Sequence, residues 1–156
     1  MAPRAKYTAV WLAAWIWLIP RAQGADPAWT TRLDQVQRRY DERVEPIFAG
    51  KCFDCHAERE WKPWYSWIPG AAGSITEQKT AALRRLNFTR GFPFEAPVGP
   101  REQLEMLRSS LADHDMPPSW YWAVTPGVAL TEPEEGVILD WIAESLEILE
   151  RGRLRR

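Results

Sequence analysis

The feature that most constrains this chain is a pentapeptide, Cys52-Phe53-Asp54-Cys55-His56. It contains both cysteines of the 156-residue sequence, so the chain has too few thiols for the disulfide framework of a small secreted scaffold. Three of its five side chains carry a thiol or an imidazole, and a short helical turn would bring them to one side. The pentapeptide is therefore a candidate site for a metal or a cofactor.

The spacing of the pentapeptide has a chemical reason. Two thiols three residues apart can each add to one vinyl group of a haem, and the next residue can place its imidazole beneath the iron. Cys-x-x-Cys-His is the attachment signature of c-type haem. The sequence therefore predicts one covalently bound haem c, attached through Cys52 and Cys55, with His56 as the proximal iron ligand.

Two other interpretations of the pentapeptide remain open at this point. A zinc site needs four ligands, and beyond these three residues the chain has only His114 as a further cysteine or histidine. A simple disulfide, or a redox pair of the thioredoxin type, is the other alternative. The redox pair would need a parallel sheet around it, and few β-branched alternating runs are present.

The first 24 residues have the pattern of a secretory signal peptide. Arg4 and Lys6 precede an unbroken apolar run at residues 9–19, Pro20 ends the run, and small residues precede a cleavage site after Gly24. The run is much shorter than the roughly 20 residues of a membrane-spanning helix, which makes an uncleaved anchor the weaker alternative. We therefore expect an exported, periplasmic protein whose mature chain is residues 25–156.

The charge balance narrows the class of partner. The full chain has 20 Lys and Arg against 21 Asp and Glu, a net charge of −1. Removal of the leader takes away three cations and no acid, so the mature chain carries −4. This net negative charge argues against a nucleic-acid binder, which would carry a basic excess. We expect redox protein partners, with weak complementarity to a basic surface, and no membrane span in the mature chain.

Hydrophobic periodicity and capping signals predict helices throughout the mature chain. An amphipathic pattern runs from Thr31, a plausible cap, to Ile47, with a kink expected at Pro46. Ser74-x-x-Glu77 predicts a helix cap, and that helix runs to about Leu86 with Ile75, Ala82 and Leu83 on its buried side.

Two further helices complete the expected domain. Pro100 suits the first position of a helix through Leu111, and Thr131-x-x-Glu134 predicts a capping box for a final helix through Leu149. The connection from Gly91 to Gly99 is expected to be a loop. The mature chain is thus predicted to be a single all-α domain.

The sixth position of the iron has several candidate ligands. Met116 lies in Asp113-His114-Asp115-Met116-Pro117-Pro118, where two proline rings fix the backbone and can hold a thioether in place. His114 is the alternative ligand, an open position is another, and Met106 is expected in the core beside Leu104 and Leu107. We predict Met116 as the distal ligand. A methionine together with a histidine raises the haem potential, which suits electron transfer.

From about Val44 to Trp141 the chain resembles the haem-binding domain family of bacterial mono-haem c-type cytochromes. The resemblance implies a cytochrome c-like helical fold with His56 proximal and Met116 distal. A tryptophan-rich stretch and Gly91-Phe92-Pro93-Phe94 depart from the family pattern. The matching elements are Pro46-Ile47-Phe48, Cys52-x-x-Cys55-His56, Trp64-Tyr65, Ile68-Pro69, Asn87-Phe88-Thr89, Met116-Pro117-Pro118, Tyr121, and Leu130-Thr131 leading to Trp141.

The aromatic residues after the motif have two expected roles. Trp61, Trp64 and Trp67 are predicted to wall the haem crevice and exclude water. The indole N–H of Trp64 or the hydroxyl of Tyr65 is a candidate hydrogen-bond donor to a haem propionate. Trp120 and Tyr121, which follow Met116, are candidates for the same role.

Two function classes follow from these features. A closed iron predicts a non-enzymatic electron carrier between redox partners, and Met116 before two prolines favours it. A haem enzyme of peroxidase type, or a small-ligand sensor, would keep the sixth position open or displaceable. A haem subunit of a larger redox complex is a third possibility, since the mature chain shows no catalytic constellation of its own.

Overall fold

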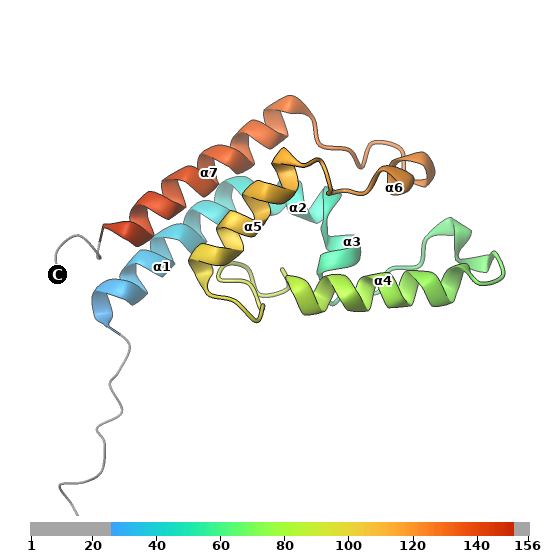
Figure 1. The fold of residues 1–156 in the computed structure, drawn as a ribbon, viewed down its shortest axis with the longest axis horizontal. Helices are drawn as coiled ribbons and strands as arrows, with labels where there is room; N and C mark the ends of the chain where they lie inside the picture. The colour runs from blue at the N-terminus through green and yellow to red at the C-terminus, as the bar shows by residue number, and fades with distance from the viewer. Residues whose placement is uncertain (1–25, 152–156) are drawn as a thin grey trace, which may run out of the picture.

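The computed structural model describes residues 26–151, and the predicted signal peptide lies outside them. The described chain is all-α, as predicted; it contains no β-strand, and one isolated bridge pairs Asn87 with Glu95. In chain order, Figure 1 shows α1 (Pro27–Arg39), the π-helix η2 (Tyr40–Val44), α2 (Glu45–Lys51), α3 (Phe53–His56), the 3-10 helix η3 (Trp64–Trp67), α4 (Ala71–Arg85), α5 (Pro100–Ala112), α6 (Ser119–Val124) and α7 (Glu132–Glu150).

The first helix starts earlier than its hydrophobic pattern predicts. Asp26 is the N-cap, its side chain accepts a hydrogen bond from the backbone N–H of Ala28, and Pro27 follows at the first position. The hydroxyl of Thr31 instead donates to the carbonyl of Pro27, one turn back inside the helix. The prediction of a cap at Thr31 was therefore wrong, because a stronger cap lies five residues upstream.

The helix changes register just before Pro46. Residues Tyr40–Val44 form the π-turn η2, and the backbone N–H of Glu45 donates to the carbonyl of Tyr40. Pro46 has no N–H for the usual bond four residues back, so a local wide turn lets α2 continue to Lys51. The expected distortion at Pro46 is therefore present, as a change of hydrogen-bond register.

Helix α4 also begins upstream of its predicted cap. Gly70 is the N-cap, with a left-handed φ of 85°, and Ser74 lies inside the first turn, where its hydroxyl accepts from the side chain of Gln78. No residue of α4 is fully buried by protein. Ile75, Ala82 and Leu83 are only half-buried, so the apolar side of α4 lacks a complete protein partner.

The starts of the two other long helices agree with the sequence. Pro100 occupies the first turn of α5, and Thr131 and Glu134 form a complete capping box at α7. The hydroxyl of Thr131 accepts from the backbone N–H of Glu134, whose carboxylate accepts from the N–H of Thr131. Helices α1 and α7 then run side by side in opposite directions (Figure 1).

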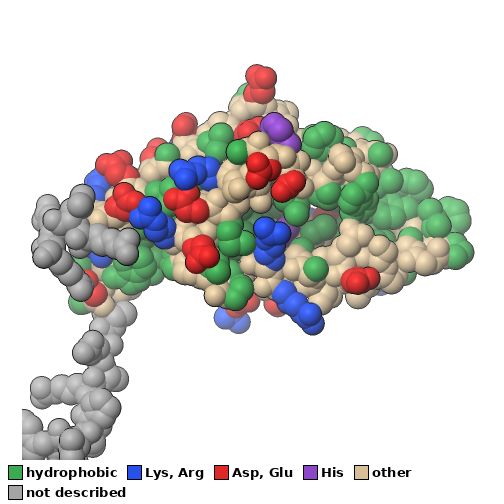
Figure 2. Space-filling model, viewed as in Figure 1, with side chains coloured by type: hydrophobic (Ala, Val, Ile, Leu, Met, Phe, Trp, Pro, Cys, Tyr) green, Lys and Arg blue, Asp and Glu red, His purple; other side chains and the backbone are tan. Residues whose placement is uncertain are grey.

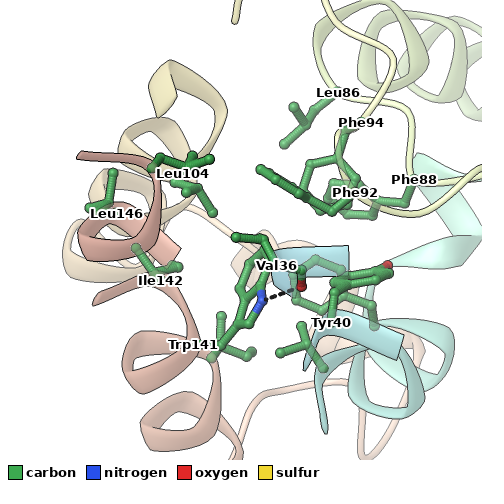
Figure 3. Close-up of a cluster of buried hydrophobic side chains, with 14 of the residues drawn as sticks. Val36, Tyr40, Leu86, Phe88, Phe92, Phe94, Leu104, Trp141, Ile142 and Leu146 are labelled. Carbon is green, nitrogen blue, oxygen red and sulfur yellow. Dashed lines mark hydrogen bonds between the residues drawn. The ribbon is translucent and has the colours of Figure 1, made fainter. Parts of the chain in front are cut away.

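An aromatic cluster joins the long helices to the loop after α4. Trp141 of α7 is fully buried, and its indole N–H donates to the carbonyl of Val36 in α1 (Figure 3). Tyr40, Phe92 and Phe94 pack their rings around it, with centroids 5.5–6.4 Å from the Trp141 ring. The Gly91–Gly99 connection is thus a loop, as expected, but it supplies two of the core rings.

The side chain of Gln103 in α5 fixes this loop. It accepts a hydrogen bond from the backbone N–H of Phe94 and donates to the carbonyls of Phe94 and Val98. A buried amide that is satisfied in this way holds a loop without regular structure.

Among the described residues, no helix is long and apolar enough to cross a membrane.

Candidate haem site

One cavity of about 400 Å³ lies between the pentapeptide, α4, α5 and the segment that leads into α6. Its volume falls within the roughly 300–1,000 Å³ of ligand sites in proteins. Figure 2 shows the molecule hollowed between α4 and the side that carries α5 and α6. The lining residues are Phe48, Lys51, Cys52, Asp54, Cys55, His56, Gln78, Ala81, Ala82, Arg85, Leu86, Phe88, Met106, Leu107, Ser110, Leu111, Met116, Pro117, Pro118, Trp120, Tyr121, Leu130 and Ile138.

The pentapeptide forms a single helical turn at the cavity wall. Cys52 is the N-cap of α3, and the backbone N–H groups of Cys55 and His56 donate to its carbonyl at 3.2 and 2.9 Å. Both thiols and the imidazole line the cavity, as the spacing predicts. Their roles in attachment and ligation remain predictions.

The imidazole of His56 is oriented by the segment that follows α4. Its Nδ1 lies 2.7 Å from the carbonyl oxygen of Leu86, and the ring stacks on Phe88 with centroids 4.9 Å apart. The backbone N–H of Phe88 also donates to the carbonyl of His56 at 2.7 Å. A carbonyl partner requires Nδ1 to carry the proton, so Nε2 is left with the lone pair that a metal needs.

Burial also prepares His56 as a ligand. It lowers the pKa of the imidazole, which favours the neutral form that binds iron. The sequence identified His56 but not the Leu86 carbonyl, which is 30 residues away. The sequence did contain a clue to this partner, since Leu86 directly precedes Asn87-Phe88-Thr89, one of the elements that match the family.

The pKa shifts of the two thiols are opposite in direction to those of a reactive redox pair. Burial raises the pKa of Cys52 to about 12, with a further increase from Cys55, and burial also raises the pKa of Cys55. Reactive Cys-x-x-Cys pairs have a lowered thiol pKa. Within residues 26–151, no three His, Cys, Asp or Glu side chains are arranged to hold a metal ion, so the zinc alternative lacks a ligand set there.

The structure separates the three candidates for the distal ligand. Met116 lines the cavity with Pro117 and Pro118, although 42% of its surface is exposed. His114 is exposed, has a left-handed φ of 52°, and is not part of the cavity wall. Met106 was expected in the core but is half-buried and lines the cavity, because its side of α5 faces α4 across the cavity.

The tryptophans after the motif do not form the cavity wall. Trp64 and Trp67 are 65% and 75% exposed, and neither they, Trp61 nor Tyr65 lines the cavity. The indole N–H of Trp64 donates to the carbonyl of Val124 at the end of α6. The expected wall is supplied instead by Trp120 and Tyr121 and by the aliphatic side chains of α4 and α5.

Tyr65 and Tyr121 differ in what their hydroxyls do. Tyr65 is buried, and its hydroxyl has no hydrogen-bond partner in the described part of the chain. Burial raises its pKa, as do the nearby Cys55 and Asp54, so the hydroxyl remains a donor. Tyr121 instead donates to Oδ2 of Asp54 at 2.7 Å. The proposed bond from Tyr65 to a propionate stays a prediction.

These residues fit a haem. The cavity is mostly apolar, and its wall holds two thiols, an imidazole with a free nitrogen and a thioether. Arg85 also lines the cavity and suits a carboxylate such as a propionate. Lys51 lines it too, but its ammonium already donates to the carbonyls of Gly127 and Ala129. The unpartnered hydroxyl of Tyr65 is a buried donor close to the motif, and such donors normally have an acceptor.

An all-α domain whose cavity brings these groups together fits a haem-binding protein. The chain belongs to the haem-binding domain family, whose model matches residues 12–144. The match is longer than the resemblance from about Val44 to Trp141, and it begins within the predicted signal peptide. No curated protein and no solved structure matches the chain.

Proposed function

We propose that the protein is an exported mono-haem c-type cytochrome that carries electrons between redox partners, with its iron held by His56 and Met116. The observation that carries the proposal is that one cavity contains both cysteines, His56 with its free Nε2, and Met116. Haem iron supplies the chemistry, a one-electron change between the ferrous and ferric states.

The protein residues have separate tasks in this proposal. Cys52 and Cys55 anchor the group covalently, and the Leu86 carbonyl and the Phe88 ring keep His56 in one orientation. The mostly apolar wall suits an apolar ring system. A thioether from Met116 raises the reduction potential relative to a second imidazole. Because His56 and Met116 would both stay bound, little rearrangement would accompany electron transfer.

The setting of the protein is also a proposal. The signal-peptide pattern at residues 1–24 supports export, and the mature charge of −4 supports a redox partner with a basic contact surface. The rate of such a reaction should fall as salt screens the attraction. The role is that of a carrier rather than an enzyme.

A second function is favoured by one observation. Met116 is 42% exposed, so a small ligand has access to the residue that would close the iron. If Met116 is readily displaced, the protein is a peroxidase-like haem enzyme or a small-ligand sensor, either alone or as the haem subunit of a larger redox complex.

The test starts from protein made with export and haem-attachment machinery. We expect one haem per chain that stays bound through acid–acetone extraction, reversible voltammetry, and negligible peroxidase turnover in the native state. Rapid binding of cyanide or carbon monoxide under native conditions would favour the enzyme or sensor. Free extraction of the haem would contradict the c-type assignment.

A further inference from the structure

One side-chain hydrogen bond connects the segment that carries Met116 to the haem-attachment motif. The hydroxyl of Tyr121 in α6 donates to Oδ2 of Asp54 in α3, at 2.7 Å and across 67 positions of sequence. Asp54 lies between Cys52 and Cys55, and Tyr121 follows Met116 by five residues. Both partners line the cavity. The bond therefore ties together two parts of the cavity wall that are distant in sequence.

Both partners of this bond are themselves held in place. The other carboxylate oxygen of Asp54 accepts from the guanidinium of Arg59, which also lies over the ring of Phe53. Tyr121 is 2% exposed, and its ring meets Trp61 and Trp120 in edge contacts with centroids 5.8 and 5.6 Å apart. A hydrogen bond to a carboxylate is stronger than a neutral one, and burial of the tyrosine shields it from water.

Met116 lies between the end of α5 at Ala112 and the start of α6 at Ser119. Only four residues separate it from Tyr121, and two of them are prolines whose φ is fixed by the ring. This short, restricted link leaves the backbone at Met116 little freedom to move independently of Tyr121.

We propose that Tyr121 is a positioning residue for the distal ligand. Its hydrogen bond to Asp54 holds the Met116 segment against the attachment motif and so limits the displacement of Met116 by external ligands. The inference rests on the proposed ligation of the iron by His56 and Met116. It assigns Tyr121 a different role from the propionate contact that its sequence position suggests.

The experiment compares the full-length holoprotein with Tyr121→Phe, which keeps the ring and removes the hydroxyl. The readout is the affinity of the ferric protein for imidazole, followed by absorbance. We expect the variant to retain its haem and to bind imidazole roughly tenfold more tightly, since it loses a hydrogen bond to a charged group. Asp54→Asn, which weakens the acceptor, should shift the affinity in the same direction by a smaller factor.

Tyr40→Phe is the matched control. Tyr40 is fully buried, its hydroxyl has no hydrogen-bond partner among the described residues, and it does not line the cavity. Its loss should leave the imidazole affinity unchanged. A purely structural role of Tyr121 would lower the unfolding midpoint of Tyr121→Phe while its imidazole affinity stayed within about twofold of the wild type, and this result would overturn the inference.

Met116→Ala separates this inference from the proposed function. If the wild type and Met116→Ala share the same ferric spectrum and the same imidazole affinity, Met116 is not a ligand, and both the ligation and the role of Tyr121 are wrong. If Met116→Ala alters both but Tyr121→Phe alters neither, the ligation stands and only the role of Tyr121 is wrong.

Discussion

At the scale of single residues, Met116 decides between a closed and an open iron. Substitution by Ala removes the thioether from the cavity wall and leaves nothing of similar reach at that position. We expect Met116→Ala to lose the weak far-red absorption of sulfur bound to ferric haem. It should also bind carbon monoxide or cyanide readily and have a lower reduction potential. Absorption spectra and voltammetry of the two ferric proteins measure these changes.

His114→Ala and Met106→Ala are the controls for that substitution. His114 is exposed outside the cavity, so its loss should change neither the spectrum nor the potential. Met106 lines the cavity from α5, and its substitution shows whether a second thioether competes for the iron. Absence of the far-red absorption from the wild type, together with ready ligand binding in His114→Ala but not in Met116→Ala, would assign the site to two histidines.

At the scale of elements, the capping box of α7 makes a pH-dependent contribution to stability. The N–H of Thr131 donates to the carboxylate of Glu134, and this bond lowers the pKa of Glu134 below its ordinary value. The ionised form is thus favoured in the folded protein. The stabilisation is fully present above the ordinary carboxyl pKa and is lost as the pH falls through the lowered one.

We expect Thr131→Ala to reduce the free energy of unfolding by about 1 kcal/mol at neutral pH, as measured by urea denaturation. Glu134→Gln should lower it as well, by an amount that shrinks as the pH falls. Glu135→Gln is the matched control, since Glu135 lies in the same first turn and takes no part in the capping box. An equal, pH-independent effect of both glutamine variants would refute the assigned role of Glu134.

At the scale of the whole molecule, the haem is expected to complete the packing of α4. None of the fifteen residues of α4 is fully buried by protein, yet Ala81 and Ala82 line the cavity. In protein made without haem attachment, backbone amides of α4 should exchange with solvent about a hundredfold faster than in the holoprotein. Amides in the middle of α7, around the buried Trp141, should change far less.

Hydrogen exchange monitored by mass spectrometry on both forms provides this comparison. Helix α7 from Trp141 onward serves as the internal reference, because α7 packs on α1 and α5 and its cavity-lining residue, Ile138, lies before this part. Equal protection of α4 in the two forms would show that the helix is held by protein contacts alone. Uniform loss of protection in all helices would show instead that the whole fold depends on the haem.

Several properties were predictable from the sequence because they depend on neighbours along the chain. The spacing of Cys52, Cys55 and His56 within one turn predicts the cofactor, and the family match supports a haem. Hydrophobic periodicity predicts the all-α class, and Thr131 and Glu134 predict the start of α7. The predicted caps at Thr31 and Ser74 were wrong, because Asp26 and Gly70 begin those helices upstream.

Other properties were decided only by the tertiary structure. The Leu86 carbonyl that orients His56, the position of Met106 in the cavity wall and the bond from Tyr121 to Asp54 each join segments distant in sequence. Periodicity shows that a helix has an apolar side, but not what that side will face. The physical reason is that local spacing sets hydrogen bonds within a turn, whereas the packing of α4, α5 and α6 around one cavity determines which side chains meet.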